Sequence, residues 1–440
     1  MEAVRITDKT RRGAFLVLKD VEESKAYTHL ALLSYIRRVK PPGAPFLREL
    51  VYETVRRKLY LDWVIGNFVK TPIEKLPVND RILLRMGLEQ IIFMNSVPDY
   101  AAVSETVELA KRYARGRESF INGVLRAYIR DRGYLVLPKR EDGEITYLSI
   151  RHSFEPWIVS MWLDQFKDSN KTEILLASLN QRPELQLRVN TLWTDAASLA
   201  DRLEKRGYKV STDPEMPRLL SVRGEGLLDL NVFGAGLFSV QDKGSQIVVD
   251  ILDPKPGETI IDVCAGRGGK AMAIAESMQD MGRVIATDLY KRKTEEIQSE
   301  AARLQIRIVD TWTWDATTTD SEYIGAADRV LVDAPCSGIG TARRKPEVKY
   351  KKLDSEMMTL PQLQLDILKA SSQYVKPGGV LVYSTCTIAS RENEEVIAAF
   401  LRKNHDFKSV LQRQLLPSTD GTDGFFICKM HREEKEAFGV

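Results

Sequence analysis

Between residues 246 and 385 the chain repeats one pattern, in which a short apolar run is followed by a stretch with helical spacing. The runs lie at 259–263, 284–287, 330–332 and 379–383. Short continuous apolar runs are typical of parallel strands that are buried on both faces. Strands that alternate with helices predict a doubly wound α/β domain, which binds its ligands at the carboxyl ends of the strands.

A glycine-rich turn follows the first run. It comprises Cys264, Ala265, Gly266, Arg267, Gly268, Gly269 and Lys270. Glycines between a strand and a helix let the backbone approach a ligand and expose N–H groups at the helix start. The turn is not a Walker A loop, because Cys264 replaces the first glycine and Ala271 replaces Ser or Thr. Asp288 ends the second run, where an acidic residue usually holds a ribose hydroxyl. On these residues alone, a nicotinamide enzyme and an S-adenosylmethionine (SAM) enzyme fit equally well.

Two cysteines stand at the ends of the last two runs. Cys336 closes Asp333-Ala-Pro-Cys, and Cys386 closes Ser384-Thr-Cys. Both would lie at the mouth of the cofactor cleft, where a dehydrogenase needs no such pair. A single free Cys is commonly buried packing. This pair instead favours a thiolate nucleophile.

The first part of the chain differs in both periodicity and charge. Residues 11–130 have helical spacing throughout, interrupted by Pro72, Pro77 and Pro98, which predicts a small helical bundle. Residues 1–140 carry a net charge of +10 and residues 141–440 a net charge of −7, although the whole chain carries only +3. A basic front end is typical of a module that binds a polyanion.

A smaller α/β unit is expected between these two parts. Residues 185–189 alternate like a half-buried strand, 195–206 have the spacing of an amphipathic helix, and 208–210 form another short strand. We therefore expect three domains, at 1–140, 145–240 and 241–440.

Several classes of protein are excluded by what the sequence lacks. No apolar run approaches the ~20 residues that cross a bilayer, and the first twelve residues do not resemble a signal peptide. The four cysteines form no CxxC pair and the four histidines form no cluster, so we expect no metal site. A cytoplasmic protein is the expectation.

Taken together, these motifs resemble the RNA 5-methylcytosine methyltransferases, and among them the bacterial 16S rRNA (cytosine-5) methyltransferases. The likeness covers nearly the whole chain. Three N-terminal segments resemble a NusB-type RNA-binding helical domain, two more border the small α/β (ferredoxin-like) subdomain, and one matches the last strand of the family: 46–52, 97–103 and 120–126; 187–191 and 239–242; 423–426.

The resemblance implies SAM as the cofactor and 16S ribosomal RNA as the partner of a protein that we expect to be a monomer. Residues 264–270 would contact SAM together with Asp288 at the ribose hydroxyls, Asp315 at the adenine edge, and Asp333. Cys386 would be the nucleophile that adds to carbon 6 of cytosine, and Cys336 would assist product release. Asp333 would act as an acid at ring nitrogen 3, with Lys270 in the same cleft.

One departure from the family concerns Gly266-Arg267, where the family usually has Ala-Pro. Losing the proline frees φ, and Arg267 adds a cation expected near the methionine end of SAM, where it either pairs with the carboxylate or points to solvent.

The basic turn Arg343, Arg344 and Lys345 is a candidate for binding RNA phosphates. Two alternatives stay open: an RNA-binding protein with an inactive methyltransferase domain, and a NAD-dependent oxidoreductase.

Overall fold

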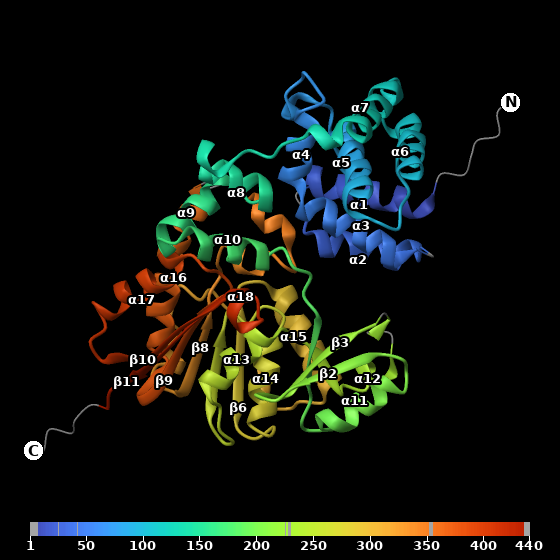
Figure 1. Cartoon of the computed structure of the whole chain (residues 1–440). Coiled ribbons are helices and arrows are strands. Elements are labelled where there is room, and N and C mark those ends of the chain that lie inside the picture. The colour runs from blue at the N-terminus through green and yellow to red at the C-terminus, as the bar shows by residue number, and fades with distance from the viewer. Residues whose placement is uncertain are drawn as a thin grey trace, which may run out of the picture. The chain divides into compact units, whose positions relative to one another are not determined.

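The structure is a computed structural model that describes residues 8–24, 26–41, 43–224, 226–227, 230–351 and 355–434. The chain divides into two compact units (Figure 1), one of Met1–Asn180 with Ala342–Lys352 and the other of Gln181–Thr341 with Leu353–Val440. None of the described helices combines the length and the apolar character that a membrane span requires.

The first unit is helical, as the periodicity predicts. Its N-terminal helices are α1 (Lys9–Ser24), α2 (Thr28–Val39), α3 (Ala44–Arg56), α4 (Lys58–Gly66), α5 (Val78–Phe93), α6 (Asp99–Tyr113) and α7 (Glu118–Asp131). Pro77 and Pro98 directly precede α5 and α6, because proline has no N–H to continue a preceding helix and its fixed φ suits a helix start. The apolar faces meet in a core that includes Phe15, Leu47 and Leu83.

Three further helices belong to this compact unit, which extends to Asn180. They are α8 (Glu144–His152), α9 (Pro156–Phe166) and α10 (Ser169–Ser178). The physical reason is bonding across the charged, turn-rich stretch. For example, the backbone N–H of Tyr60 donates to Ser153 Oγ at 2.9 Å. That stretch is a connection within the helical unit.

The segment Ala342–Lys352 also packs in the helical unit, although it follows the Asp333–Cys336 motif in the chain. It contains the short helix η7 (Pro346–Tyr350). Trp157 Nε1 donates to the carbonyl oxygen of Lys351 at 3.0 Å, and the N–H of Lys58 donates to Tyr350 Oη at 3.1 Å. No local pattern in the sequence predicts this crossover.

The second unit begins with a small antiparallel sheet in the order β2-β3-β1-β4. Its elements are β1 (Leu185–Val189), α11 (Ala196–Glu204), β2 (Lys209–Asp213), β3 (Met216–Arg223), α12 (Asn231–Gly234) and β4 (Phe238–Val240). The expected strands and helix are present, whereas β3 and β4 were not predicted. Because side chains alternate along a strand, Leu187 and Val189 fill the core of this subdomain, while Gln186 and Arg188 lie on the opposite face.

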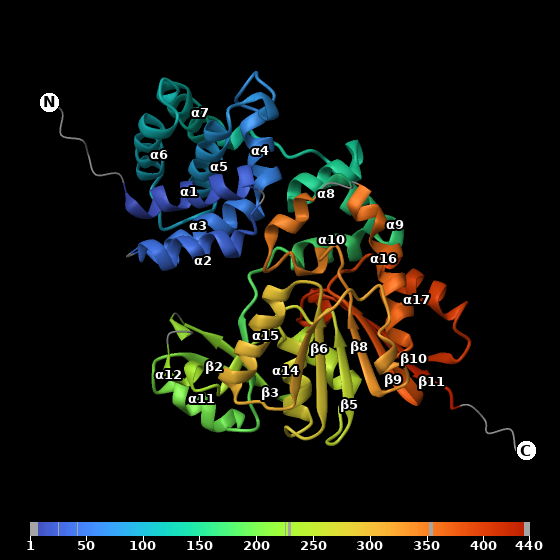
Figure 2. The same ribbon diagram turned by 180° about the vertical axis from the view of Figure 1, so that it is seen from behind.

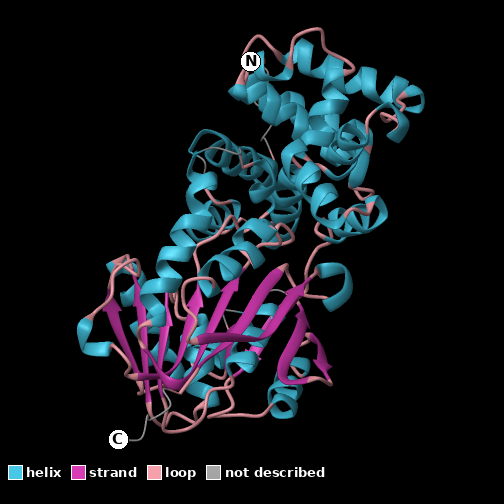
Figure 3. Cartoon of the chain, turned by 90° about the vertical axis from the view of Figure 1, so that its left-hand side faces the viewer, coloured by secondary structure: helices cyan, strands magenta, loops and turns pink. Residues whose placement is uncertain are grey.

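A seven-stranded sheet forms the rest of the unit, in the order β10-β11-β9-β8-β5-β6-β7. Figure 3 shows the strands of this unit in magenta. The strands are β5 (Thr259–Val263), β6 (Arg283–Asp288), β7 (Val309–Thr313), β8 (Ala327–Asp333), β9 (Val375–Thr385), β10 (Phe407–Leu415) and β11 (Phe425–Arg432). The pairs from β7 through β9 are parallel, and β11 pairs antiparallel with both β9 and β10. All four predicted runs are strands of this sheet.

Helices cover both faces of the sheet, which confirms the doubly wound prediction (Figure 2). On one face the strands pack on α13 (Lys243–Leu252), α14 (Gly269–Ser277) and α15 (Lys291–Leu304), and on the other on α16 (Ser355–Ser372) and α17 (Glu394–Leu401). The strand order reverses between β5 and β8. Ligands of such sheets bind beyond the carboxyl ends of the strands at this switch point.

Candidate functional site

The glycine-rich turn lies between β5 and α14 and depends on left-handed backbone. Gly266 and Gly268 have φ of +61° and +80°, and Cys264 has a φ of +61°. A Cβ at Gly268 would approach the side chain of Ile297 to 3.0 Å, whereas a Cβ at Gly266 would meet nothing within 4 Å. The turn therefore packs tightly on α15 at Gly268 and leaves open space in front of Gly266.

Asp288 is tied to the turn at the end of β6. Its carboxylate accepts hydrogen bonds from the backbone N–H groups of Gly266 and Tyr290, both at 3.1 Å, and from Lys293 Nζ at 3.3 Å. Asp315 follows β7 and is exposed, and it accepts from the N–H and the hydroxyl of Thr317. These hydrogen bonds lower the pKa of Asp315.

Lys270 and Asp333 form an ion pair between the turn and the end of β8. Lys270 Nζ lies 2.7 Å from Asp333 Oδ2, and Ser384 Oγ donates to Asp333 Oδ1 at 2.9 Å. Burial opposes the charge of Lys270, but the Asp333 carboxylate outweighs burial and raises the pKa of Lys270 to about 12. Both oxygens of Asp333 are thus held in place. Sequence reasoning missed Ser384, although it stands two residues before the proposed nucleophile.

The two thiols that the sequence singled out are in contact. The Sγ atoms of Cys336 and Cys386 are 3.4 Å apart. Their loops are joined by a hydrogen bond of 2.8 Å between the hydroxyls of Ser337 and Thr387, and Glu392 accepts from the N–H of Ser337 at 2.8 Å. The hydrogen bond with Cys386, together with burial, raises the pKa of the Cys336 thiol well above its usual range.

A buried carboxylate that sequence reasoning missed lies near the Lys270–Asp333 pair. Asp262, the fourth residue of β5, is fully buried, and neither of its oxygens has a hydrogen-bond partner among the described residues. Burial and the charge of Asp333 raise the pKa of Asp262 to about 8. An aspartate inside an apolar strand, directly before a glycine turn, was the available signal.

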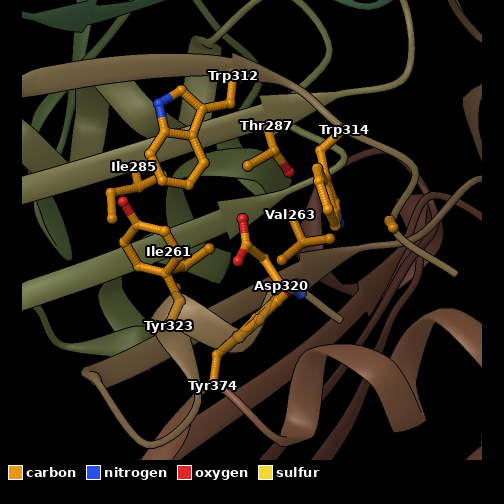
Figure 4. A pocket seen from close by; sticks show the side chains of 10 residues that line it. Ile261, Val263, Ile285, Thr287, Trp312, Trp314, Asp320, Tyr323 and Tyr374 are labelled. Carbon is orange, nitrogen blue, oxygen red and sulfur yellow. Dashed lines mark hydrogen bonds between the residues drawn. The ribbon is translucent and has the colours of Figure 1, made fainter. Parts of the chain in front are cut away.

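An apolar pocket opens beside Asp315 (Figure 4). It encloses about 330 Å³, counting the space open to solvent, and it is lined by the ends of β5, β6 and β7 with an aromatic cover. Trp314 and Ala316, the chain neighbours of Asp315, belong to its wall. Figure 4 shows Trp312, Trp314, Tyr323 and Tyr374 around the pocket. Flat apolar surface therefore adjoins the residue expected at the adenine edge.

The sequence also singled out Arg267 and the basic turn 343–345. Arg267 has 61% of its side chain exposed, and its Nε lies 3.0 Å from Glu296 Oε2 on α15, which favours the alternative that Arg267 points to solvent. Arg343, Arg344 and Lys345 are half-buried and belong to the segment that packs in the helical unit.

The residues at the turn fit SAM, which carries a sulfonium and an ammonium group. The carboxylates of Asp288 and Asp333 are paired with the ammonium groups of Lys293 and Lys270, whereas buried Asp262 has no hydrogen-bond partner among the described residues. A cationic ligand nearby would favour the ionised form of Asp262. The described residues contain no group of three His, Cys, Asp or Glu that could hold a metal ion.

Comparison with known families assigns each part of the chain. The family model for 16S rRNA methyltransferase RsmB/F matches residues 249–431, the NusB family matches residues 8–130, and the ferredoxin-like domain of RsmF/B-like methyltransferases matches residues 154–226. These matches confirm the expected NusB-like, ferredoxin-like and methyltransferase parts.

Individual relatives agree over nearly the full length. The chain is 36% identical over 441 residues to the probable ribosomal RNA small subunit methyltransferase B of Bacillus subtilis (strain 168), a match that covers 96% of this chain and 98% of that protein. It is 35% identical to the protein of the same name from Synechocystis sp. (strain ATCC 27184 / PCC 6803 / Kazusa), covering 96% and 99%.

Solved structures show the same architecture. The crystal structure of PH0851 superposes with a TM-score of 0.82 at 26% identity and covers 98% of this chain and 99% of that one. A methyltransferase homologue from Pyrococcus horikoshii has a TM-score of 0.57 at 24% identity, covers 66% of this chain and 99% of its own, and shares the fold. With these matches to its sequence and its fold, the chain belongs to the 16S rRNA methyltransferase RsmB/F family, whose cofactor is S-adenosylmethionine.

Proposed function

We propose that this protein transfers a methyl group from SAM to carbon 5 of a cytosine in 16S ribosomal RNA, through a covalent bond between Cys386 and carbon 6 of the base. The observation that carries the proposal is the contact of the Cys336 and Cys386 thiols, at 3.4 Å. They follow two paired parallel strands, β8 and β9. The ribosomal RNA substrate is taken from the names of the relatives.

The chemistry of cytosine explains why a thiol is needed. Carbon 5 is a weak nucleophile, so the Cys386 thiolate first adds to carbon 6, and the electron pair of the ring double bond moves toward nitrogen 3, which takes up a proton. Carbon 5 then has enamine character. SAM supplies an electrophilic methyl group on its sulfonium. The new bond forms between that methyl carbon and carbon 5 as the bond from the methyl carbon to sulfur breaks, and S-adenosylhomocysteine is the leaving group.

The Lys270–Asp333 pair is the proposed proton source for nitrogen 3. Asp333 was predicted to be the acid, with Lys270 as a further catalytic residue, and its carboxylate accepts hydrogen bonds from Lys270 and Ser384. The pKa of Lys270 is raised to about 12, so its ammonium keeps its proton and stabilises the Asp333 carboxylate that remains after a proton passes to the base. Ser384 keeps the second oxygen of Asp333 in a fixed direction.

Product release requires that carbon 5 lose its proton and that the bond from carbon 6 to Cys386 Sγ break. We assign assistance in this step to Cys336. The main cause of the raised Cys336 pKa is the hydrogen bond between Cys336 and Cys386. Once Cys386 Sγ is bonded to carbon 6, this hydrogen bond is lost. Cys336 then becomes easier to ionise at the stage where a base is needed.

The alternatives are weaker. Family membership excludes a nicotinamide oxidoreductase. An RNA-binding protein with an inactive methyltransferase domain is disfavoured by the thiol contact and the Lys270–Asp333 pair. We also propose that the protein works as a cytoplasmic monomer and that its basic residues 1–140 and the turn Arg343–Lys345 contact RNA.

Bisulfite sequencing of ribosomal RNA tests the reaction. Cells that lack the gene should lose one protected cytosine in 16S rRNA, a plasmid with the wild-type gene should restore it, and a plasmid carrying Cys386→Ser should not. Purified protein with SAM should protect the same cytosine in RNA from the deleted strain. An unchanged pattern in the deleted strain would refute the proposed substrate, and restoration by Cys386→Ser would refute the proposed nucleophile.

A further inference from the structure

Arg188, a buried residue of the small sheet, contacts the cofactor turn. Arg188 on β1 has no exposed surface, although it lies on the sheet face opposite the core of its own subdomain. Its Nε and Nη2 donate to the two carboxylate oxygens of Glu276 on α14 at 2.8 and 2.9 Å. This is the bidentate geometry that favours Arg over Lys.

The rest of the guanidinium is committed to the start of the same helix. Arg188 Nη1 donates to the carbonyl oxygen of Gly269 at 2.8 Å and to Gln241 Oε1 at 2.5 Å. Gly269 is the first residue of α14 and the sixth of the cofactor turn. Arg188 therefore holds α14 at two places, at Gly269 and two turns further along at Glu276.

On its other side the turn meets the groups of the proposed site. Lys270 pairs with Asp333, and the N–H of Gly266 donates to Asp288. Gly266 and Gly268 lack a Cβ and adopt positive φ, and glycine has more accessible backbone conformations than other residues, so contacts are needed to fix the turn. The contact from Arg188 to Gly269 is one such restraint, and it comes from residues outside the methyltransferase sheet.

Stability alone is a weak reason for such an arginine. Burying a guanidinium and a carboxylate carries a large desolvation cost, and apolar residues of similar volume often serve stability equally well. A carbonyl at a helix start gains nothing from a buried charge except a fixed position. The contact with Gly269 is thus explained best by orientation of the turn.

We propose that Arg188 is a positioning residue for SAM, which acts through Gly269 to hold residues 266–270 in the binding conformation. The small subdomain then contributes to cofactor affinity without touching the cofactor. The inference rests on the assignment of residues 264–270 as the SAM site.

The chain contains a matched control in Arg303 on α15. Arg303 also joins the small subdomain to a helix of the methyltransferase sheet, because it donates to the carbonyl oxygen of Phe233 at 2.7 Å, to that of Phe238 at 3.1 Å, and to Ser239 Oγ at 3.1 Å. It pairs with Glu300 on its own helix. None of these contacts reaches the turn.

The test compares Arg188→Lys with Arg303→Lys in the full chain, by calorimetric titration with S-adenosylhomocysteine. Lysine keeps a positive charge opposite Glu276 but cannot reach Glu276 and Gly269 together. We expect Arg188→Lys to weaken affinity tenfold or more and Arg303→Lys less than twofold, at comparable losses of melting temperature. In methylation assays KM for SAM should rise for Arg188→Lys, with kcat at saturating SAM nearly unchanged.

Two further variants separate the possible failures. Arg188→Met with Glu276→Met removes the buried charges together, so it covers the case in which Arg188→Lys does not fold. Wild-type affinity in either Arg188 variant would overturn the inference. Asp288→Asn reports on the site itself: wild-type affinity there would refute the cofactor assignment, whereas lost affinity with an unaffected Arg188→Lys would refute only the role of Arg188.

Discussion

The ammonium group of Lys349 lies 2.7 Å from the carbonyl oxygen of Arg56, 293 residues earlier in the chain. Lys349 is fully buried, and its remaining donors reach the carbonyl oxygen of His152 at 3.1 Å and Asn180 Oδ1 at 2.6 Å. One side chain thus joins three parts of the helical unit. The segment that carries it leaves the methyltransferase unit at Thr341, five residues after Cys336.

Lys349→Met should destabilise the helical unit by about 2–4 kcal/mol, because three buried acceptors lose their donor. The measurement is the midpoint of unfolding in denaturant. Lys139→Met, a change at an exposed lysine of the same unit, should leave the midpoint unchanged. Equal midpoints for both variants would show that Lys349 is dispensable.

Deleting residues 1–140 removes Arg56 and should likewise destabilise Ala342–Lys352.

Cys386→Ser should abolish methyl transfer and leave affinity for S-adenosylhomocysteine within about tenfold, since the thiol acts on the base. Single-turnover methylation of 16S rRNA and calorimetry measure the two quantities. A serine variant that retains a substantial fraction of the wild-type rate would contradict the proposed nucleophile.

Cys336→Ala should trap the reaction after methylation. Without the neighbouring thiol, which lies 3.4 Å from Cys386, elimination slows and a protein–RNA adduct through Cys386 accumulates. The adduct appears as a slow band on a denaturing gel, and it should vanish in the double variant with Cys386→Ser. Normal turnover without a band would reduce Cys336 to packing.

SAM binding should release a proton from Asp262. Its pKa is raised to about 8 by burial and by Asp333, and a bound cation lowers that pKa, so affinity should fall as the pH drops below about 8. Titrations in buffers of different ionisation enthalpy count the protons. Asp262→Asn should abolish the release; an unchanged count would place the proton elsewhere.

The raised pKa of Asp262 also determines how its contribution to stability changes with pH. The folded pKa of Asp262 is about 8, above the ~3.9 of an unfolded chain. Its contribution to the stability of the unliganded protein is therefore fully present below about pH 4 and is lost as the pH rises through 8. Relative to wild type, Asp262→Asn should gain stability over that interval.

Arg267→Ala should change affinity for S-adenosylhomocysteine by less than about twofold, because a single exposed ion pair, here with Glu296, contributes little. Calorimetric titration with S-adenosylhomocysteine measures this affinity. A tenfold loss would mean that Arg267 leaves Glu296 to contact the cofactor carboxylate.

Local sequence determined the strands and the turn of this protein. The run 259–263 is β5 itself, and the glycines that follow it adopt the left-handed φ that they alone adopt readily. Cys336 and Cys386 could be placed at neighbouring strand ends because buried parallel strands meet at one edge of a sheet. These features depend on residue type and on spacing over a few positions.

Tertiary structure decided which side chains touch. The pairing of Lys270 with Asp333 and Ser384, and that of Arg188 with Glu276 and Gly269, join residues between 51 and 88 positions apart. The crossover of Ala342–Lys352 into the helical unit is of the same kind. Such contacts follow from strand register and from the packing of whole subdomains. No periodicity within one segment encodes them, because the free energy that selects them comes from burial against distant parts of the chain.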